Sequence, residues 1–580
     1  MKNTKFSGKL LAMSAVAVLL AVGFAGVPFT GSSYASEPEY APASDFEYEV
    51  VTIDNEDVIK LTKYTGDASD LYLPPVIDGL PVTIIGDQMF AVYVPGRPSP
   101  NFPEDQLKTV VIPDSVTTIE YFAFHSNRSL ETVIIGNSVE HIGQGTFTLC
   151  TSLTSVTMGE NVKHIDDSVF SSCTALESIV IPDSVESIGN LAFSHCRELR
   201  SIIIPDGVTS ISNGTFIGCT ALESIVIPGS VESIGVGAFK ECSSLASIVI
   251  PDSVESIGQT AFYDCAALES VIIPNSVTSI ENETFSGCRA LKSVVIPDSV
   301  KSIGERAFFD CRVLKSVVIP DSVESIVSLA FSNCHGLESV TIGDSVESIG
   351  EQAFFYCKSL KSIVIPDSVT SIGRSAFSGC TVLNLIVLSN NLLSIEDKTF
   401  NNCDTLESIV IPDSVTSIGY YAFYNCISLE SIAIPDSVES IDSLAFRHCT
   451  SLSDVHVSGN NTTYITNYFT DTFSDADATV VPYTISMMPY TAPSGNAAVN
   501  KGWAFTPTTV SDVTIVVSGA DWLSVSGNVI YGTPTETGVY EVTVVLHKIG
   551  YEDRVETFTL SVVSELVVLN SPANGAIFAV

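Results

Sequence analysis

The stretch SIVIPDSVESIGNLAFSHCREL, from Ser178 to Leu199, is one unit of a repeat that decides the fold. Fifteen phenylalanines from Phe124 to Phe446 follow one another at an unbroken spacing of 23 residues, and each of the 14 cysteines lies three residues after one of the last fourteen. A fixed period of this length is typical of a solenoid, in which similar units stack. The organisation of the 580 residues therefore follows the repeat rather than the usual domain length.

Each unit is expected to contain a strand, a turn, an extended segment and a short helix. With Phe as position 1, apolar residues recur at positions 4, 7, 10, 12, 16, 19 and usually 23. The alternating S-I-V-I run ends at Pro182, which predicts a strand stopped by proline and followed by a P-D-S turn. The spacing of Ala192, Phe193 and Cys196 predicts about one helical turn that faces inward. Stacked units should form a buried structural ladder, which in two successive units consists of Ile188, Phe193, Cys196, Leu199, Ile211, Phe216, Cys219 and Leu222.

From about Asp105 to Ser458 the repeat resembles the BspA-type branch of the leucine-rich repeat family, whose units follow C-x-x-L-x-x-I-x-I-P-x-S-V-x-x-I-G-x-x-A-F. The segment from Phe46 to Phe90 is similar to the N-terminal cap and first degenerate unit of that family. A Pro-rich insertion follows Phe90, and Asp454 to Tyr483 departs from the register as a terminal cap would. The resemblance implies a surface-exposed or secreted binding protein, often an adhesin.

Beyond Val481 the period ends, and the composition predicts an all-β module. Alternating segments at 514–517, 529–531 and 539–545 are separated by turn residues, and this stretch resembles cadherin-like or immunoglobulin-type modules. The expected organisation is a signal peptide (1–35), a cap with degenerate repeat and insertion (36–104), the solenoid with its terminal cap (105–481), an immunoglobulin/cadherin-like sandwich (482–565) and a tail (566–580).

The N-terminus predicts export. Three lysines at positions 2, 5 and 9 precede an apolar run from Leu10 to Val27, and Ser33-Tyr34-Ala35 supplies a small-x-small cleavage signal. The mature chain is expected to begin at Ser36 and not to insert in a membrane, although an uncleaved N-terminal anchor stays open as an alternative. The net charge of −40, from 66 acidic and 26 basic residues, argues against nucleic acid as a partner.

The cysteine spacing favours buried, unpaired structural thiols. Fourteen cysteines in an exported chain would normally suggest disulfides, but translation along a stack keeps equivalent Cβ vectors parallel instead of convergent. No C-x-x-C occurs, which argues against zinc. We therefore expect neither a metal nor another cofactor.

Two polar columns have both a functional and a structural interpretation. Aspartate recurs at position 14, for example at Asp298 and Asp321, where it could bridge calcium or simply accept a backbone N–H in the P-D-S turn, which we favour. His141 and His164 share one position in neighbouring units and could bind a metal or respond to pH, but ordinary surface histidines are the favoured interpretation.

The outward face of the strand carries the candidate binding residues. Position 9 is serine twelve times, and position 11 is Val or Ile in most units, so equivalent residues should align as an apolar stripe between hydroxyls. Such a stripe could dock an extended peptide or another flat apolar partner, whereas plain β-propensity explains it without a function. The candidate residues are Val180, Ile203, Val226, Val249, Ile272, Val295, Val318 and Val364.

No catalytic motif is found. The chain has no G-x-S-x-G, no H-E-x-x-H and no P-loop, so we do not expect an enzyme. The first hypothesis is a secreted or cell-surface binding or adhesion protein, monomeric, with an extracellular protein or glycan ligand. The alternatives are a structural component that assembles through the stripe into a surface layer or fibre, and an exported enzyme whose catalytic part is not recognised.

Overall fold

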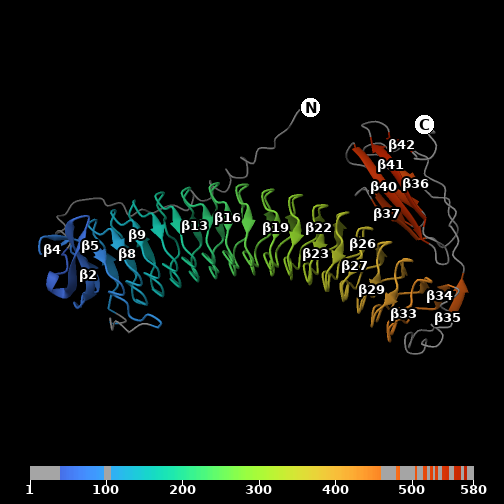
Figure 1. The fold of residues 1–580 in the computed structure, drawn as a ribbon, viewed down its shortest axis with the longest axis horizontal. Coiled ribbons are helices and arrows are strands. Elements are labelled where there is room, and N and C mark those ends of the chain that lie inside the picture. Colours follow the sequence, from blue (N-terminus) through green and yellow to red (C-terminus); the bar gives the residue numbers. More distant parts are fainter. Residues whose placement is uncertain are drawn as a thin grey trace.

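The computed structural model describes residues 39–96, 103 and 106–458, together with eight strands between residues 479 and 570. From the N-terminal cap onward, successive 23-residue coils stack into an elongated solenoid (Figure 1). Most coils contribute one strand to each of two parallel ladders, and the segments around Ser178 and Val249 join the first ladder through single bridges. The predicted signal peptide lies outside the described residues.

The first ladder is built from the strands at positions 9 to 12, which end where proline or a substitute follows at position 13. Equivalent residues pair in parallel register, as Ile203 does with Val226. Its strands are β3 (Asp70–Tyr72), β6 (Thr109–Val111), β8 (Thr132–Ile134), β10 (Ser155–Thr157), β13 (Ser201–Ile203), β15 (Ser224–Val226), β18 (Ser270–Ile272), β20 (Ser293–Val295), β22 (Ser316–Ile319), β24 (Ser339–Ile342), β26 (Ser362–Val364), β28 (Leu385–Val387), β30 (Ser408–Val410), β32 (Ser431–Ile434), β34 (Asp454–Ser458) and β35 (Thr479–Tyr483).

The second ladder uses the two-residue strands at positions 18 and 19, and the N-terminal cap extends it. Its strands are β1 (Phe46–Ile53), β2 (Glu56–Tyr64), β4 (Val76–Ile77), β5 (Leu80–Ile85), β7 (Thr118–Ile119), β9 (His141–Ile142), β11 (His164–Ile165), β12 (Ser187–Ile188), β14 (Ser210–Ile211), β16 (Ser233–Ile234), β17 (Ser256–Ile257), β19 (Ser279–Ile280), β21 (Ser302–Ile303), β23 (Ser325–Ile326), β25 (Ser348–Ile349), β27 (Ser371–Ile372), β29 (Ser394–Ile395), β31 (Ser417–Ile418) and β33 (Ser440–Ile441).

The cap begins with an antiparallel hairpin of β1 and β2. Its two turn residues, Asp54 and Asn55, have φ of 52° and 66°, as a two-residue hairpin turn requires. The second strand of the hairpin, β2, then pairs parallel with β5 and so joins the cap to the solenoid. The hairpin therefore covers the edge that the first coil would otherwise leave unpaired.

The predicted short helix at the end of each unit is wrong. Leu191 and His195 have φ of 57°, and their N–H groups donate to the carbonyls of Asn213 and Ile217 in the next coil. Since these donors bond between coils, they cannot form the i to i−4 bonds of a helix. The segment is a turn ladder, and the helix that the described residues contain is the 3-10 turn η1 (Ala43–Asp45).

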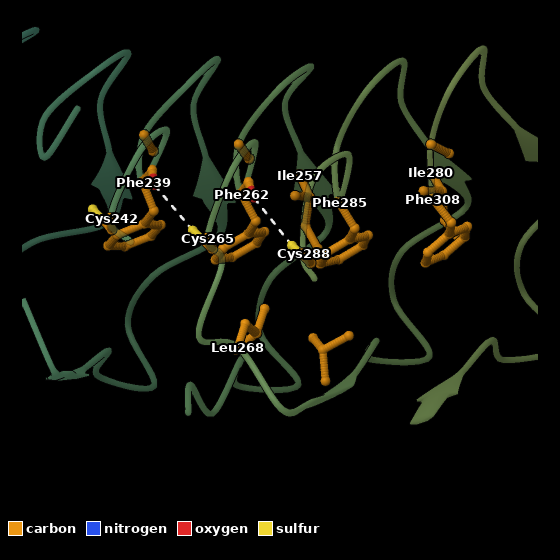
Figure 2. Close-up of a cluster of buried hydrophobic side chains, with 14 of the residues drawn as sticks. Phe239, Cys242, Ile257, Phe262, Cys265, Leu268, Ile280, Phe285, Cys288 and Phe308 are labelled. Atoms are coloured by element: carbon orange, nitrogen blue, oxygen red, sulfur yellow. Dashed lines mark hydrogen bonds between the residues drawn. The ribbon is translucent and has the colours of Figure 1, made fainter. Parts of the chain in front are cut away.

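A column of sixteen fully buried phenylalanines, from Phe90 to Phe446, runs through the core. Neighbouring rings stack with centroids 4.7 to 5.8 Å apart (Figure 2). Phe90 and Phe124 are 34 residues apart in sequence, yet their rings stack at 4.7 Å. The Pro-rich insertion between them therefore does not interrupt the phenylalanine column.

Every cysteine is buried and unpaired, which confirms the prediction of structural thiols. Each Sγ donates to the carbonyl of the phenylalanine 26 residues earlier at 3.1 to 3.4 Å, and Figure 2 shows two of these bonds, from Cys265 and Cys288. A small apolar side chain with one weak donor suits this position, because the accepting carbonyl is buried between coils.

After β35 the described strands pair antiparallel in two sheets, with orders β36-β39-β38 and β37-β40-β41-β42. Their bounds are β36 (Trp503–Phe505), β37 (Thr514–Ser518), β38 (Leu523–Ser526), β39 (Val529–Gly532), β40 (Gly538–His547), β41 (Arg554–Val562) and β42 (Val567–Asn570). This segment is all-β over these residues, and its immunoglobulin-like identity stays a prediction.

Two glycines give a direct test of how closely the coils approach. A Cβ built on Gly159 would lie 2.2 Å from the carbonyl oxygen of Gly136 in the preceding coil, whereas a Cβ on Gly229 meets nothing within 4 Å. We expect Gly159→Ala to lower the free energy of unfolding by about 1–3 kcal/mol, since the backbone must shift. Gly229→Ala should be neutral or stabilising by up to about 1 kcal/mol. Urea denaturation of both variants checks this, and equal stabilities would contradict the coil spacing.

Candidate functional site: the exposed face of the first strand ladder

The eight predicted stripe residues, here called the valine stripe, all lie exposed on the first ladder. Their exposed fractions run from 40% for Val364 to 79% for Val249, while positions 10 and 12 on either side point into the core. Parallel pairing aligns Ile203 with Val226, and a bridge continues the column to Val249. At about 4.8 Å per coil, the stripe runs roughly 40 Å along the solenoid. Thr341 interrupts it opposite Val318.

The side chains of the predicted structural ladder point into the interior of the solenoid. The side chains of Phe193, Cys196 and Leu199 are fully buried, and Ile188 is nearly so. Their equivalents in the next coil, Phe216, Cys219, Leu222 and Ile211, are buried in the same way. The stripe is thus carried on a continuous apolar core, which fixes its geometry along the rod.

The residues of position 14, shortly after the end of each first-ladder strand, form a polar column along the solenoid. Asp321 Oδ1 accepts the N–H of Asp344 at 2.9 Å, and Asp367 Oδ1 accepts the N–H of Asn390 at 2.9 Å. In these pairs the donor lies in the next coil, not in the residue's own turn as predicted. Such bonds occur where the next coil replaces the proline of position 13, here by Gly343 or Ser389. Among the described residues no three metal-ligating side chains come together.

Charged side chains of position 8 precede the stripe and pair between coils. Lys292 Nζ lies 2.9 Å from Glu269 Oε2. The two carboxylate oxygens of Glu338 lie 2.7 Å from Lys315 Nζ and 3.4 Å from Lys361 Nζ. The two lysines that neighbour Glu338 lower the pKa of its carboxyl below the ordinary value. These exposed pairs are worth little for stability, so this edge is free to vary in sequence.

The histidine pair has a partner that the sequence did not suggest. His141 Nε2 lies 3.0 Å from Oδ2 of Asp166. His164 Nδ1 is 2.9 Å from Ser187 Oγ, and the two rings are 6.3 Å apart. Each histidine thus bonds to a different neighbour.

The buried cysteines offer no reactive site. Burial raises the pKa of Cys196 and of Cys380 to about 12, and a bond to the backbone only partly offsets this. A thiol with such a pKa stays protonated at neutral pH, and a protonated, buried thiol is a poor nucleophile.

A shallow depression of about 470 Å³ lies at the N-terminal end of the same face. It is lined by the position-11 residues Val111, Ile134 and Thr157 and by Tyr40 and Pro75 of the cap, among others. Sequence reasoning missed it, because the cap residues come from outside the repeat. It shows that the outward face of the first ladder is hollowed where the cap meets the coils.

The repeat matches a known family model and is similar to solved structures of bacterial proteins. The family model described as BspA type leucine-rich repeat region (6 copies) matches residues 99–223, 164–292, 209–337, 278–391 and 380–492. A leucine-rich repeat protein from Bacteroides ovatus is similar at 25% identity and a TM-score of 0.54, over 76% of this chain and 98% of that chain. A leucine-rich cell surface protein from Faecalibacterium prausnitzii is similar at 28% identity over 76% of this chain and 99% of that chain, with a TM-score of 0.32.

A search of curated proteins finds no match. The family that matches is defined by a repeat region rather than by a catalytic domain. In the part of the chain that the structure describes, no helix has the length and hydropathy needed to cross a membrane.

Proposed function

Because the chain belongs to the BspA-type leucine-rich repeat family, we propose that it is a secreted or cell-surface binding protein whose valine stripe docks an extracellular protein or glycan. The observation that carries the proposal is the stripe itself, in which eight Val and Ile side chains lie exposed in register. A large exposed apolar patch marks an interaction surface more often than apolar residues scattered singly do.

The chemistry of the face favours a flat, extended partner. From Val180 to Val364 the stripe offers exposed apolar side chains and, beside them, the hydroxyls of position 9. The net charge of −40 opposes face-to-face pairing of two copies, which favours a monomer over a self-assembling layer. The family match to a repeat region supports a non-enzymatic role.

Export and the C-terminal module complete the proposal. The cleavage signal before Ser36 would release the chain from the cytoplasm. The antiparallel strands from β36 to β42 are compatible with an immunoglobulin- or cadherin-like spacer that holds the solenoid away from its attachment point.

Replacing stripe residues tests the docking role. We expect Val226→Thr, Val249→Thr and Val295→Thr together to reduce binding to extracellular matrix proteins and glycans at least tenfold, because the apolar contact is lost while the strand is kept. Thr341 shows that threonine is accepted at this position, so stability should change by no more than about 0.5 kcal/mol per site.

The matched control is Ser224→Thr, Ser270→Thr and Ser293→Thr at position 9, which adds a methyl group at each site and keeps the hydroxyl. It should bind like the natural protein. If the stripe variant also binds like the natural protein, the stripe is not the docking surface. Light scattering of the natural protein should show a monodisperse monomer, and a concentration-dependent polymer would favour the assembly alternative.

A further inference from the structure

Four successive coils concentrate basic side chains on one edge of an otherwise acidic rod. Nine of the 26 lysines and arginines of the chain fall between Arg289 and Arg374. Most of these lie at two outward positions, 5 and 8, on either side of the buried leucine of position 7. Stacking places the positions in columns, so residues 23 apart in sequence become neighbours. We call the group Arg289, Lys292, Arg312, Lys315, Lys358 and Lys361 the basic cluster.

A buried carboxylate holds the two arginines of the cluster. Asp310, only 8% exposed, accepts from Arg289 Nε at 3.0 Å and from Arg312 Nε at 2.8 Å. Arg312 Nη2 also donates to Asp310 at 3.2 Å, and Arg289 Nη1 lies 3.0 Å from Asp264. Both arginine side chains are about half exposed. The hydrogen bonds to Asp310 and Asp264 fix the side-chain conformations of both arginines. A ligand that contacts the remaining N–H groups therefore pays little side-chain entropy on binding.

The cluster carries a net positive charge. Its six cations face the four acids Asp264, Asp310, Glu269 and Glu338, so the local charge is about +2 on a chain of −40. In the described part of the chain no carboxylate lies within ion-pair distance of Lys358, whose Nζ is 5.3 Å from the centroid of the Tyr356 ring. Partial burial lowers the pKa of His335, which lies between these coils, and the charges of Lys358 and Arg312 lower it further. The nearby carboxylate of Asp310 acts in the opposite direction and raises this pKa.

We propose that the basic cluster is a binding site for a linear anionic polysaccharide bearing sulfate or carboxylate groups. The cationic columns repeat at about 4.8 Å per coil and run about 14 Å over four coils. A polysaccharide with one charge for every one or two sugar rings can place its anions on these columns. A nucleic acid carries a denser line of charge and would extend from the cluster over acidic coils, where it is repelled. The site shares no residue with the valine stripe and does not depend on the proposed function.

The test measures binding of dextran sulfate to the full chain, with neutral dextran as the uncharged probe. At 50 mM salt we expect dextran sulfate to bind and neutral dextran not to bind. For about four ion contacts, the logarithm of the affinity should fall with the logarithm of salt at a slope of roughly −3. Absence of dextran sulfate binding, or equal binding of neutral dextran, overturns the proposal.

Two triple variants with the same net charge locate the site. Lys315→Gln, Lys358→Gln and Lys361→Gln remove exposed lysines and leave the arginine pair on Asp310 intact, so folding should be kept. This variant should bind dextran sulfate at least tenfold more weakly, with a shallower salt slope. The control Lys163→Gln, Arg200→Gln and Lys240→Gln lies in other coils and should stay within twofold of the natural protein. Equal losses in the two variants would mean a general charge effect and overturn the site.

Two further measurements set the limits of the proposal. The stripe variant should bind dextran sulfate like the natural protein, because it leaves the cluster untouched, and a loss as large as that of the lysine variant contradicts a separate site. Oligothymidylate is the second probe. Tighter binding of oligothymidylate than of dextran sulfate would overturn the polysaccharide assignment in favour of single-stranded nucleic acid.

Discussion

Above pH 9 the free energy of unfolding is expected to fall steeply, because buried thiols resist ionisation. Burial raises the pKa of twelve cysteines above the ordinary value of 9.0, to about 12 for Cys196 and Cys380. Below pH 9 both states keep these protons and stability is complete. Between 9 and the folded pKa only the unfolded chain releases them, so rising pH favours unfolding.

The effect is large because it is repeated. Each such cysteine removes about 1.4 kcal/mol per pH unit in this window, so twelve remove on the order of 16 kcal/mol per unit. A loss of that size rivals the whole stability of an ordinary domain, roughly 5–15 kcal/mol. Urea denaturation at pH 8.0, 9.0, 9.5 and 10.0, followed by circular dichroism, measures the slope.

A double variant separates the thiols from tyrosine and lysine, which also titrate at alkaline pH. Cys265→Ala with Cys288→Ala should make the slope shallower by roughly 3 kcal/mol per pH unit, whatever it does to stability at pH 7. An unchanged slope in the double variant, or a natural protein that stays fully stable to pH 11, would show that the thiols are not the cause.

Phe262→Ala should destabilise the solenoid more than other single truncations. The ring of Phe262 is fully buried and stacks on Phe239 at 5.4 Å and on Phe285 at 5.3 Å. Its removal leaves a cavity between three coils that the stacked strands cannot close, and the expected loss is about 3–5 kcal/mol. The midpoint of urea denaturation at pH 7 measures it.

The adjacent residue is the matched control for this truncation. Tyr263 is partly exposed on the outside of the same turn ladder, and Lys240 Nζ lies 5.0 Å from the centroid of its ring. We expect Tyr263→Ala to cost no more than about 1 kcal/mol. Similar losses for the two variants would mean that the phenylalanine column is not the core that stabilises neighbouring coils.

The two surface proposals depend on the same stacking as the core. Both the valine stripe and the basic cluster consist of residues that are individually unremarkable on an exposed surface. They become sites because parallel register repeats one side chain at each coil, as between Ser293 and Ser270 or Val364 and Val387. A substitution that shifted the register would therefore alter both surfaces at once.

Much of the local structure follows from the sequence alone. The alternation around Val226 predicts which side chains of the first ladder point inward, since successive strand residues face opposite sides. Proline at position 13 predicts where that strand ends. The invariant spacing of Phe and Cys predicts their columns, because a period that never slips leaves equivalent residues in equivalent places.

The turn ladder was not predictable in this way. Ala192, Phe193 and Cys196 have the inward spacing of one helical turn, and a turn ladder gives the same spacing. The difference is the partner of each N–H. The N–H of Phe193 donates to the carbonyl of Thr215 in the next coil at 2.9 Å. The residue pattern within one unit does not predict a bond to another unit.

By itself, the sequence determined the repeat, its buried positions and the outward column of Val and Ile, because each depends on residue type and spacing within 23 residues. Only the tertiary structure decided the path of the turn ladder, the cap that covers the first coil and the grouping of Arg289 and Arg312 around Asp310. These depend on hydrogen bonds and ion pairs between different coils or strands, whose partners are known only once the chain is stacked.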